Sequence, residues 1–422
     1  MVLVRRAASV VLVLLPLILY STALGGDWPC FRGLNGDGIS PLKEINKDWN
    51  KNPPKMLWKI EFTDGVGYAG LAVADGKLYV GDRVPEGDQG AVRAIDNKDG
   101  KEVWRTLYPD PVWDAWKSFI YSTPLVHDGK VYIWSRRGQA LCMNAKTGEK
   151  IWERKLVEEY PSADKPDYGF ASSPVANEKS VIFLPGGTNN ASIAALDKDT
   201  GKTVWQSGSN KVSYATPVVA TLNGRKQIIA FVGPGLFSYD PATGKEIWNL
   251  PWPTQYDDKK GPTPVVVGDR IFVATTEGSE TGLIEIKDDK PAVVWKYKDV
   301  QNHFPTSVYY HGRIYCESDP TEVVCIEPAT GKILWKQPVN DFTSLIGVDD
   351  TIIALGGGGR SAGGQLVMID ATVPEYKELG RVIQTFKKPG PNGQIMCWAA
   401  PIIANNCLFI RSQNELACFD LK

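Results

Sequence analysis

The sequence predicts an all-β fold: an eight-bladed β-propeller of four-stranded antiparallel blades, closed by an N-terminal outer strand. Three observations lead to this prediction. A hairpin that ends in Trp recurs along the chain, with successive Trp residues 46, 48, 53, 43, 47 and 40 positions apart. Each repeat carries four short strand signals, and eight copies of each strand type are present. The two ends of the repeated region also complement each other. Four-stranded units at a period of roughly 40–50 residues are typical of propeller blades.

The strands of one repeat follow in a fixed order. The first begins with a Ser/Thr-Pro step, as at Thr216-Pro217, and the second follows a tight turn such as Asp128-Gly129. The third ends in an acidic or amide residue. The hairpin Tyr239-Asp-Pro-Ala-Thr-Gly-Lys-Glu-Ile-Trp248 then leads into the fourth strand. Asp240 can accept hydrogen bonds from turn amides, and Gly244 supplies the positive φ of a type I turn with a G1 bulge.

The fourth strand carries the recurring Trp, which we expect to lie flat over a turn of the adjacent blade. Its large apolar surface would be buried there, and its indole N–H would reach a backbone carbonyl. We interpret these residues as packing residues and not as a cofactor box. The predicted docking residues are Trp58, Trp104, Trp152, Trp205, Trp248, Trp295 and Trp335.

The ends of the repeated region predict how the ring closes. Phe419-Asp420 ends a third strand, whereas Met56–Glu61 is a fourth strand without the three that should precede it. Placing Met56–Glu61 on the outside of the last blade would close the ring and remove an exposed edge. The predicted propeller domain therefore spans residues 56–422.

The first 25 residues are typical of a secretory signal peptide. Arg5 and Arg6 form a charged start, the run from Ala7 to Tyr20 is almost entirely apolar, and small residues follow up to Gly25. The run is short of the roughly 20 residues that span a bilayer. Cleavage near residues 23–25 is therefore favoured over retention as an anchor helix. We expect an exported protein, periplasmic or secreted, with no membrane span after cleavage. Residues 26–55 are predicted to form a leader loop.

Composition argues against several classes of function. The 47 basic residues nearly balance the 48 acidic ones, so no nucleic-acid partner is expected. The seven Cys show no zinc spacing. Cys316 with Cys325 and Cys407 with Cys418 flank hairpins and can pair in an oxidising compartment, although buried free thiols are favoured. No metal site and no catalytic residue are predicted, and a monomer is expected.

Four of the hairpins resemble the tryptophan-docking motif of the PQQ-like propeller superfamily: Ala94–Trp104, Leu196–Trp205, Tyr239–Trp248 and Ile326–Trp335. The resemblance covers about residues 56–422 and implies the propeller fold. The superfamily includes quinoprotein alcohol dehydrogenases and the propeller lipoprotein of the outer-membrane β-barrel assembly machine. The segment Trp28–Gly38 resembles a leader of exported propeller proteins in planctomycete-type bacteria.

The two branches of this superfamily imply different functions. A quinoprotein dehydrogenase would hold PQQ and calcium on the axis, beneath a disulfide of adjacent Cys residues and beside an Asp base. This sequence has no adjacent Cys pair and no Cys-x-x-Cys-His haem site, so a PQQ-dependent enzyme is the alternative hypothesis. The assembly-machine scaffold is non-enzymatic and binds proteins. The sequence lacks its lipobox, so the preferred hypothesis is a general exported scaffold for a protein or other envelope ligand.

Candidate binding residues lie in the loops that join a fourth strand to the next first strand. These loops should open on one face near the axis, where aromatic side chains would form a ring. Such a ring can bind a peptide, a glycan or a flat ligand, or it can simply pack the inner strands. A glycan- or polymer-binding propeller is thus a second alternative. One further candidate, Arg360, lies at the tip of a Gly-rich hairpin. The loop candidates are Trp113, Trp116, Tyr121, Tyr168, Tyr214, His303 and Trp398.

Overall fold

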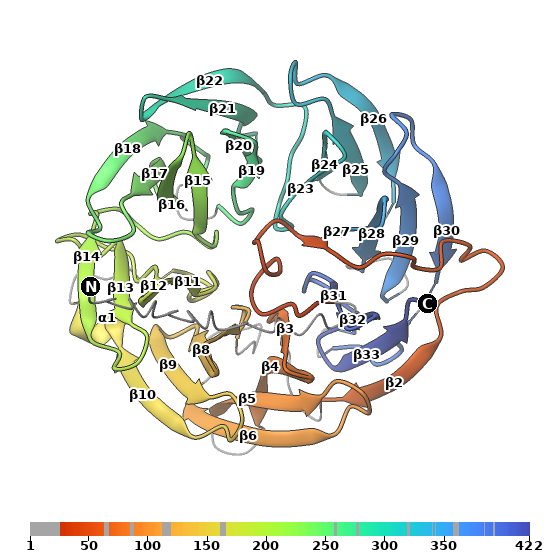
Figure 1. The fold of residues 1–422 in the computed structure, drawn as a ribbon, viewed down its shortest axis with the longest axis horizontal. Coiled ribbons are helices and arrows are strands. Elements are labelled where there is room, and N and C mark those ends of the chain that lie inside the picture. Colours follow the sequence, from red (N-terminus) through yellow and green to blue (C-terminus); the bar gives the residue numbers. More distant parts are fainter. Residues whose placement is uncertain are drawn as a thin grey trace, which may run out of the picture.

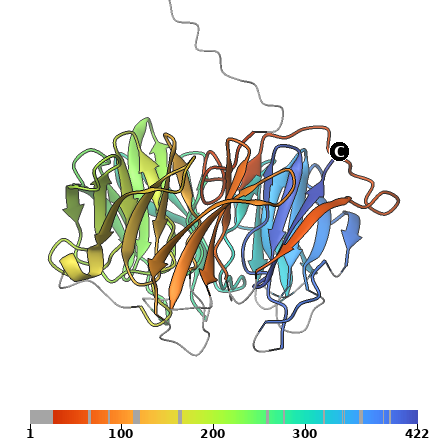
Figure 2. The ribbon, with the colours of Figure 1, turned by 90° about the horizontal axis from the view of Figure 1, so that it is seen from below.

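The strands of the chain form a ring of eight sheets around a central axis (Figure 1). The computed structural model describes residues 26–422 except 63–66, 85–87, 112–119, 161–165, 257–259, 276–277, 319–320, 340, 342, 358–362, 384 and 391–392. Within these residues, each blade contains four antiparallel strands, and one sheet has a fifth, parallel strand at its inner edge. The blades stand side by side between two faces (Figure 2). The predicted all-β, eight-bladed propeller is confirmed. The predicted signal peptide lies outside the described residues.

Blades 1 to 4 are each made of four consecutive strands that run from the axis outward. Their bounds are β3 (Leu71–Ala74), β4 (Lys77–Val84), β5 (Gln89–Asp96) and β6 (Glu102–Pro109); β7 (Leu125–His127), β8 (Lys130–Trp134), β9 (Gln139–Asn144) and β10 (Lys150–Lys155); β11 (Val175–Asn177), β12 (Ser180–Phe183), β13 (Ile193–Asp197) and β14 (Thr203–Ser207); β15 (Val218–Leu222), β16 (Arg225–Val232), β17 (Gly235–Tyr239) and β18 (Glu246–Pro251).

Blades 5 to 7 repeat this order, and blade 8 is completed from the other end of the chain. Their bounds are β19 (Val265–Val267), β20 (Arg270–Val273), β21 (Thr281–Lys287) and β22 (Lys290–Tyr297); β23 (Val308–Tyr310), β24 (Arg313–Ser318), β25 (Glu322–Ile326) and β26 (Ile333–Pro338); β27 (Ser344–Val348), β28 (Thr351–Gly356), β29 (Gln365–Asp370) and β30 (Glu378–Val382); β31 (Ile402–Ala404), β32 (Cys407–Arg411), β33 (Glu415–Asp420) and β2 (Met56–Glu61).

The predicted closure of the ring is present in blade 8. Strand β2 pairs antiparallel with β33, with Met56 opposite Phe419 and Glu61 opposite Glu415. The buried Glu415 carboxylate accepts a hydrogen bond from Lys59 Nζ at 2.6 Å. Pairing with β2 gives β33 a partner on its outer side, so the last blade has the same four strands as the others.

The hydrophobic core is divided into layers between neighbouring blades. Middle strands such as β9 and β12 are buried on both faces, and they are apolar along most of their length for that reason. One layer packs Tyr132 and Cys142 of blade 2 against Val181 and Ile193 of blade 3. All seven Cys are free thiols. The single helix among the described residues, α1 (Leu156–Glu159), has four residues. No helix in the described part of the chain is long and apolar enough to cross a bilayer.

Five of the recurring Trp residues join one blade to the next through the same contact. Trp152 donates its indole N–H to the carbonyl of Lys198 at 3.1 Å, and its ring lies on Gly201 in the same turn. A Cβ at Gly201 would stand 2.7 Å from that ring, so the turn needs glycine for space as well as for its φ of 69°. The same carbonyl and glycine contacts are made by Trp58, Trp104, Trp205 and Trp295.

Two of the predicted docking residues are placed differently, because the turns they face lack the glycine. Trp248 donates to Gln227 Oε1 of its own blade at 2.8 Å. The turn beside it, in blade 5, consists of Asp288 and Asp289. Trp335 packs edge-on against Tyr376, with ring centroids 5.3 Å apart. This Tyr belongs to the longer connection between β29 and β30.

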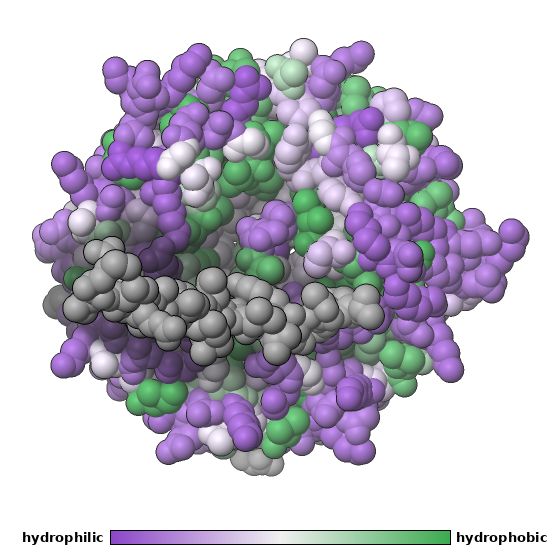
Figure 3. Space-filling view, in the orientation of Figure 1, coloured by the Kyte–Doolittle hydropathy of each residue, from purple (hydrophilic) through white to green (hydrophobic). Residues whose placement is uncertain are grey.

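The leader segment crosses one face of the ring before it reaches β2 (Figure 1). Trp28 forms an isolated antiparallel bridge with Val73 of the inner strand β3, with both N···O distances 2.8 Å. A short strand, β1 (Ile39–Ser40), pairs parallel with β27. On this face, hydrophilic side chains cover the periphery, and apolar side chains gather towards the hollowed centre (Figure 3). The leader is therefore attached to the propeller close to its axis.

Candidate functional site

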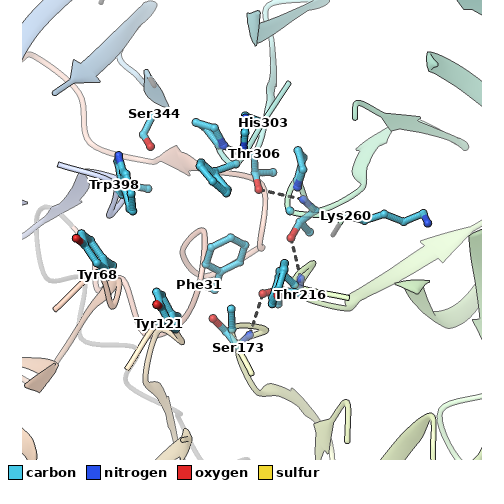
Figure 4. Close-up of a pocket in the computed structure, with 18 of the residues that line it drawn as sticks. Phe31, Tyr68, Tyr121, Ser173, Thr216, Lys260, His303, Thr306, Ser344 and Trp398 are labelled. Carbon is cyan, nitrogen blue, oxygen red and sulfur yellow. Dashed lines mark hydrogen bonds between the residues drawn. The ribbon is translucent and has the colours of Figure 1, made fainter. Parts of the chain in front are cut away.

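A pocket of about 450 Å³ lies on the axis of the propeller. Its lining comes mainly from the loops that precede the inner strands, so it opens on the face where these loops converge. The leader contributes Phe31 and Arg32 to the same pocket. In Figure 4, Phe31 lies in the middle of the ring that the other labelled residues form. The leader enters from the opposite face, beside the β3–β4 turn, where Asp27 accepts a hydrogen bond from the Asp75 amide. Phe31 and Arg32 therefore form the floor of the pocket.

One wall of the pocket consists of stacked aromatic side chains from blades 8, 1 and 2. Tyr68 lies between Trp398 and Tyr121 (Figure 4). Its ring centroid is 4.6 Å from that of Trp398 and 6.0 Å from that of Tyr121, with interplanar angles of 29° and 10°. Offset stacking of this kind fixes the ring planes, because each ring limits the rotation of the next. The wall is thus a preformed apolar surface.

The facing wall is an arc of hydroxyl groups from blades 3 to 6: Ser173, Thr216, Thr263 and Thr306. Each hydroxyl oxygen accepts the backbone N–H of the equivalent residue in the preceding blade. Figure 4 draws the hydrogen bonds among these four residues. The four N···O distances, starting from the Thr123 amide, are 2.9, 2.9, 3.0 and 3.2 Å. The recurring Ser/Thr-Pro step therefore links neighbouring inner strands around the axis, a role that sequence reasoning did not assign to it.

The aromatic wall and the hydroxyl arc occupy different blades. Gly70 holds the hydroxyl position in blade 1 and Ala400 holds it in blade 8, next to Tyr68 and Trp398 respectively. A Cβ at Gly70 would collide with the Thr123 hydroxyl. The repeat is therefore modified on one side of the axis, and this gives the pocket one apolar and one hydroxyl-bearing side.

The mouth of the pocket carries aromatic side chains that are open to solvent. Tyr168, Tyr256 and Phe304 are 43%, 42% and 44% exposed. The Tyr168 amide donates to the Tyr214 hydroxyl at 3.3 Å, and the rings of His303 and Phe304 are 3.9 Å apart. Exposed aromatic groups gathered around a concave site are typical of binding surfaces, because leaving them in water is unfavourable without such a use.

The floor is held by a buried guanidinium. Arg32 donates to the carbonyl oxygens of Thr306, Ser307 and Asp37 at 3.1, 2.7 and 2.9 Å. Burial lowers the pKa of Arg32 to about 10, so the group stays charged at neutral pH. Sequence reasoning treated residues 26–55 as a loop and missed Phe31 and Arg32, because nothing local in the leader indicates which part of the propeller it touches.

The lining does not provide the ligands of a calcium–quinone centre. Calcium prefers carboxylate and carbonyl oxygens, and no Asp or Glu is found among the described residues that line the pocket. No cluster of three metal-ligating side chains occurs elsewhere in the described part of the chain. The buried Lys260 donates to the Gly233 carbonyl and to Thr254 Oγ1, and its side chain runs away from the pocket centre (Figure 4). With Phe31 on the axis, these residues do not fit PQQ and calcium.

Five of the predicted binding residues come together in this pocket: Tyr121, Tyr168, Tyr214, His303 and Trp398. Trp113, Trp116 and Arg360 lie outside the described residues and remain predictions. Sequence reasoning did not include Phe31, Tyr256 or Phe304 among the candidates. Phe304 directly follows His303, so its position beside the ring could have identified it.

Solved structures with this fold include a BamB protein and alcohol dehydrogenases. BamB from Moraxella catarrhalis has a TM-score of 0.62 at 16% identity, and the alignment covers 87% of this chain and 99% of that chain. A quinohemoprotein alcohol dehydrogenase from Comamonas testosteroni has a TM-score of 0.70 at 14% identity, covering 93% and 80%. Likeness at this level of identity concerns the fold alone.

Sequence relatives divide in the same way. A quinoprotein ethanol dehydrogenase from Pseudomonas aeruginosa is 24% identical over 281 residues, which are 55% of this chain but only 42% of the enzyme. The outer membrane protein assembly factor BamB of Escherichia coli strain K12 is 24% identical over 355 residues, which cover 72% of this chain and 85% of that protein. The family model described as outer membrane protein assembly factor BamB matches residues 88–337, more than half of the chain. The chain therefore belongs to the BamB family of propellers.

Proposed function

We propose that this protein is an exported, non-enzymatic propeller scaffold that binds a protein or another ligand of the cell envelope at its axial pocket. The observation that carries the proposal is the set of three exposed aromatic side chains around the pocket mouth, Tyr168, Tyr256 and Phe304. Solvent-exposed aromatic groups supply binding energy when they are covered. The family name, an assembly factor, supports a binding role, and the signal-like first 25 residues support export.

A partner capture from native envelope extract tests the proposal. The double variant Tyr168→Ala/Phe304→Ala removes much of the exposed aromatic surface, and it should lose at least 90% of the ligand retained by the wild type. The double variant Leu107→Ala/Ile383→Ala is a matched control, because both side chains are exposed and lie away from the pocket. It should retain the ligand. Equal retention by all three proteins would contradict a role for the pocket.

A PQQ-dependent dehydrogenase is the second candidate, favoured by the dehydrogenase relatives. The described lining opposes it, because it offers no carboxylate and has Phe31 on the axis. Incubation with PQQ and calcium, followed by removal of free cofactor, distinguishes the two functions. We expect no stoichiometric quinone absorbance and no dye-linked oxidation of ethanol or 1-butanol. A bound quinone with turnover would refute the scaffold proposal.

A further inference from the structure

The axial pocket has the chemistry of a sugar-binding site. We infer that it recognises the end of an uncharged saccharide, one or two sugar rings in size. This inference rests on the proposed function, since it names the ligand of the same pocket. Four features of the lining carry it: the stacked aromatic wall, the opposed arc of hydroxyl groups, the absence of lining carboxylates among the described residues, and the obstructed floor.

The aromatic wall suits the apolar face of a pyranose ring. Such a ring presents several C–H groups on one face, and these pack on the negative face of an aromatic ring. Tyr68 is stacked between Tyr121 and Trp398, with centroid distances of 6.0 and 4.6 Å, so both of its faces are covered and the face for a sugar comes from one of the two outer rings. Two of the three, Tyr121 and Trp398, are partly exposed to the pocket. A saccharide can therefore lie against this side without any rearrangement of the wall.

The hydroxyl arc suits the opposite edge of the same ligand. A Ser or Thr hydroxyl has one proton and two lone pairs. In Ser173, Thr216 and Thr263, one lone pair accepts a backbone N–H, which orients the group. Each proton remains available, and no described residue accepts it. Sugar hydroxyl groups both donate and accept, so they can bind the remaining proton and the second lone pair of each side chain.

The electrostatics of the lining favour an uncharged ligand. An ionised group that enters a pocket loses hydration and needs an opposite charge in return. A cationic ligand finds no carboxylate among the described lining residues. The two cationic side chains in the lining already donate to protein oxygens: Arg32 to three carbonyls, and Lys260 to Gly233 and Thr254. Arg32 is buried, and Lys260 directs its ammonium group away from the pocket centre (Figure 4), so neither offers an anionic sugar a direct ion pair.

The size and shape of the pocket decide which part of a saccharide enters. A volume of about 450 Å³ lies towards the small end of ligand pockets, which range over roughly 300–1,000 Å³. Phe31 and Arg32 occupy the axial side opposite the mouth and obstruct it. A polymer can therefore enter only by its end, and the exposed rings of Tyr168, Tyr256 and Phe304 would contact the following residue of the chain at the mouth.

The test is binding of the purified protein to an array of oligosaccharides that end in neutral, uronic or sialic acid residues. The best neutral ligand is then measured by titration calorimetry against the wild type and variants. We expect neutral ends to bind at least tenfold more tightly than acidic ones. Trp398→Ala should weaken binding more than tenfold, whereas Trp398→Phe, which keeps an aromatic face, should recover most of the affinity.

A hydroxyl series separates recognition from folding. Thr216→Val removes the hydroxyl at nearly constant volume and should weaken binding about tenfold. Thr216→Ser should bind nearly as the wild type does. Thr221→Val is the matched control, because Thr221 lies in the inner strand β15 of the same blade and is exposed outside the pocket. Thermal melting of all three variants shows whether a loss of binding follows a loss of structure.

The inference is overturned if no neutral saccharide binds, if acidic ends bind equally well, or if the pocket variants bind as the wild type does. Its failure is distinguishable from failure of the proposed function. Should envelope extract yield a protein that requires Tyr168 and Phe304, while the saccharide array stays negative, the scaffold proposal stands and the saccharide inference falls.

Discussion

The periphery and the axis of this propeller use the same repeat in opposite ways. At the periphery, five Trp residues make nearly the same contact with the turn of the next blade. At the axis, equivalent positions before the inner strands hold different residues, among them Tyr68, Gly261 and Trp398. Positions that keep one residue type serve packing, which every blade needs equally. Positions that vary between blades give the pocket its two unlike sides, so recognition is expected there.

The largest effect should follow from removing a peripheral Trp. Trp152→Ala deletes a buried indole and its hydrogen bond to Lys198, and it should lower the free energy of unfolding by about 3–5 kcal/mol. Urea unfolding followed by circular dichroism measures this loss. A change of less than about 1 kcal/mol would mean that the peripheral contacts do not hold the blades together.

The turn beneath the Trp is the next test. In Gly244→Ala, the added methyl group collides with the ring of Trp205, and φ of 71° is strained for alanine. The two effects together should lower the free energy of unfolding by about 2–4 kcal/mol. Gly268→Ala is the matched control, because φ is 62° and no atom lies within 4 Å of the added Cβ. It should cost about 1–2 kcal/mol. Equal losses in urea unfolding would show that the indole contact adds nothing.

The acidic turn residues should make stability depend on pH. Burial raises the pKa of Asp370, but hydrogen bonds from Thr372 and Lys377 outweigh this and hold it at about 2, below the ordinary 3.8. The carboxylate therefore stabilises the fold above about pH 4, and this contribution disappears as the pH falls towards 2. Asp370→Asn should cost less than about 1 kcal/mol at pH 7. The difference from the wild type should vanish at pH 2, as unfolding in urea at both pH values will measure.

The smallest effect on stability is expected at the pocket mouth. Tyr168 and Phe304 are more than 40% exposed, so replacing either with Ala should change the free energy of unfolding by less than about 0.5 kcal/mol. Combined in one protein, the same replacements should lose at least 90% of the captured ligand. A large loss of stability would indicate that these rings pack the loops, as the alternative interpretation of the aromatic ring holds.

The sequence was sufficient for the fold because the fold is repetitive. One hairpin such as Tyr239–Trp248 indicates little, but eight aligned copies fix the strand order, the blade number and the closure by Met56–Glu61. The aromatic ring at the axis could be predicted for the same reason, since blade symmetry brings equivalent positions together. Trp248 and Trp335 differ because the adjacent turns lost the glycine on which an indole rests.

The floor of the pocket could not be predicted in this way. Arg32 binds the carbonyls of Thr306 and Ser307, which are 274 and 275 positions away. The leader occurs once, so no periodicity aligns it with the blades. The difference between the two sides of the pocket also depends on Gly70 and Ala400, which replace the hydroxyl residues in the blades that carry the aromatic wall. These two blades, 1 and 8, become neighbours only when the ring closes.

The pairing of β2 with β33 also constrains the order in which the molecule can form. Lys59 and Glu415 are 356 positions apart, so β2, which is synthesised early, must wait for β33, the last strand of the chain. Contacts of such large sequence separation are slow to form. Until they do, β33 has an unpaired edge that invites association with other chains. Folding of this ring is therefore expected to end at blade 8, where a chaperone would protect the chain most effectively.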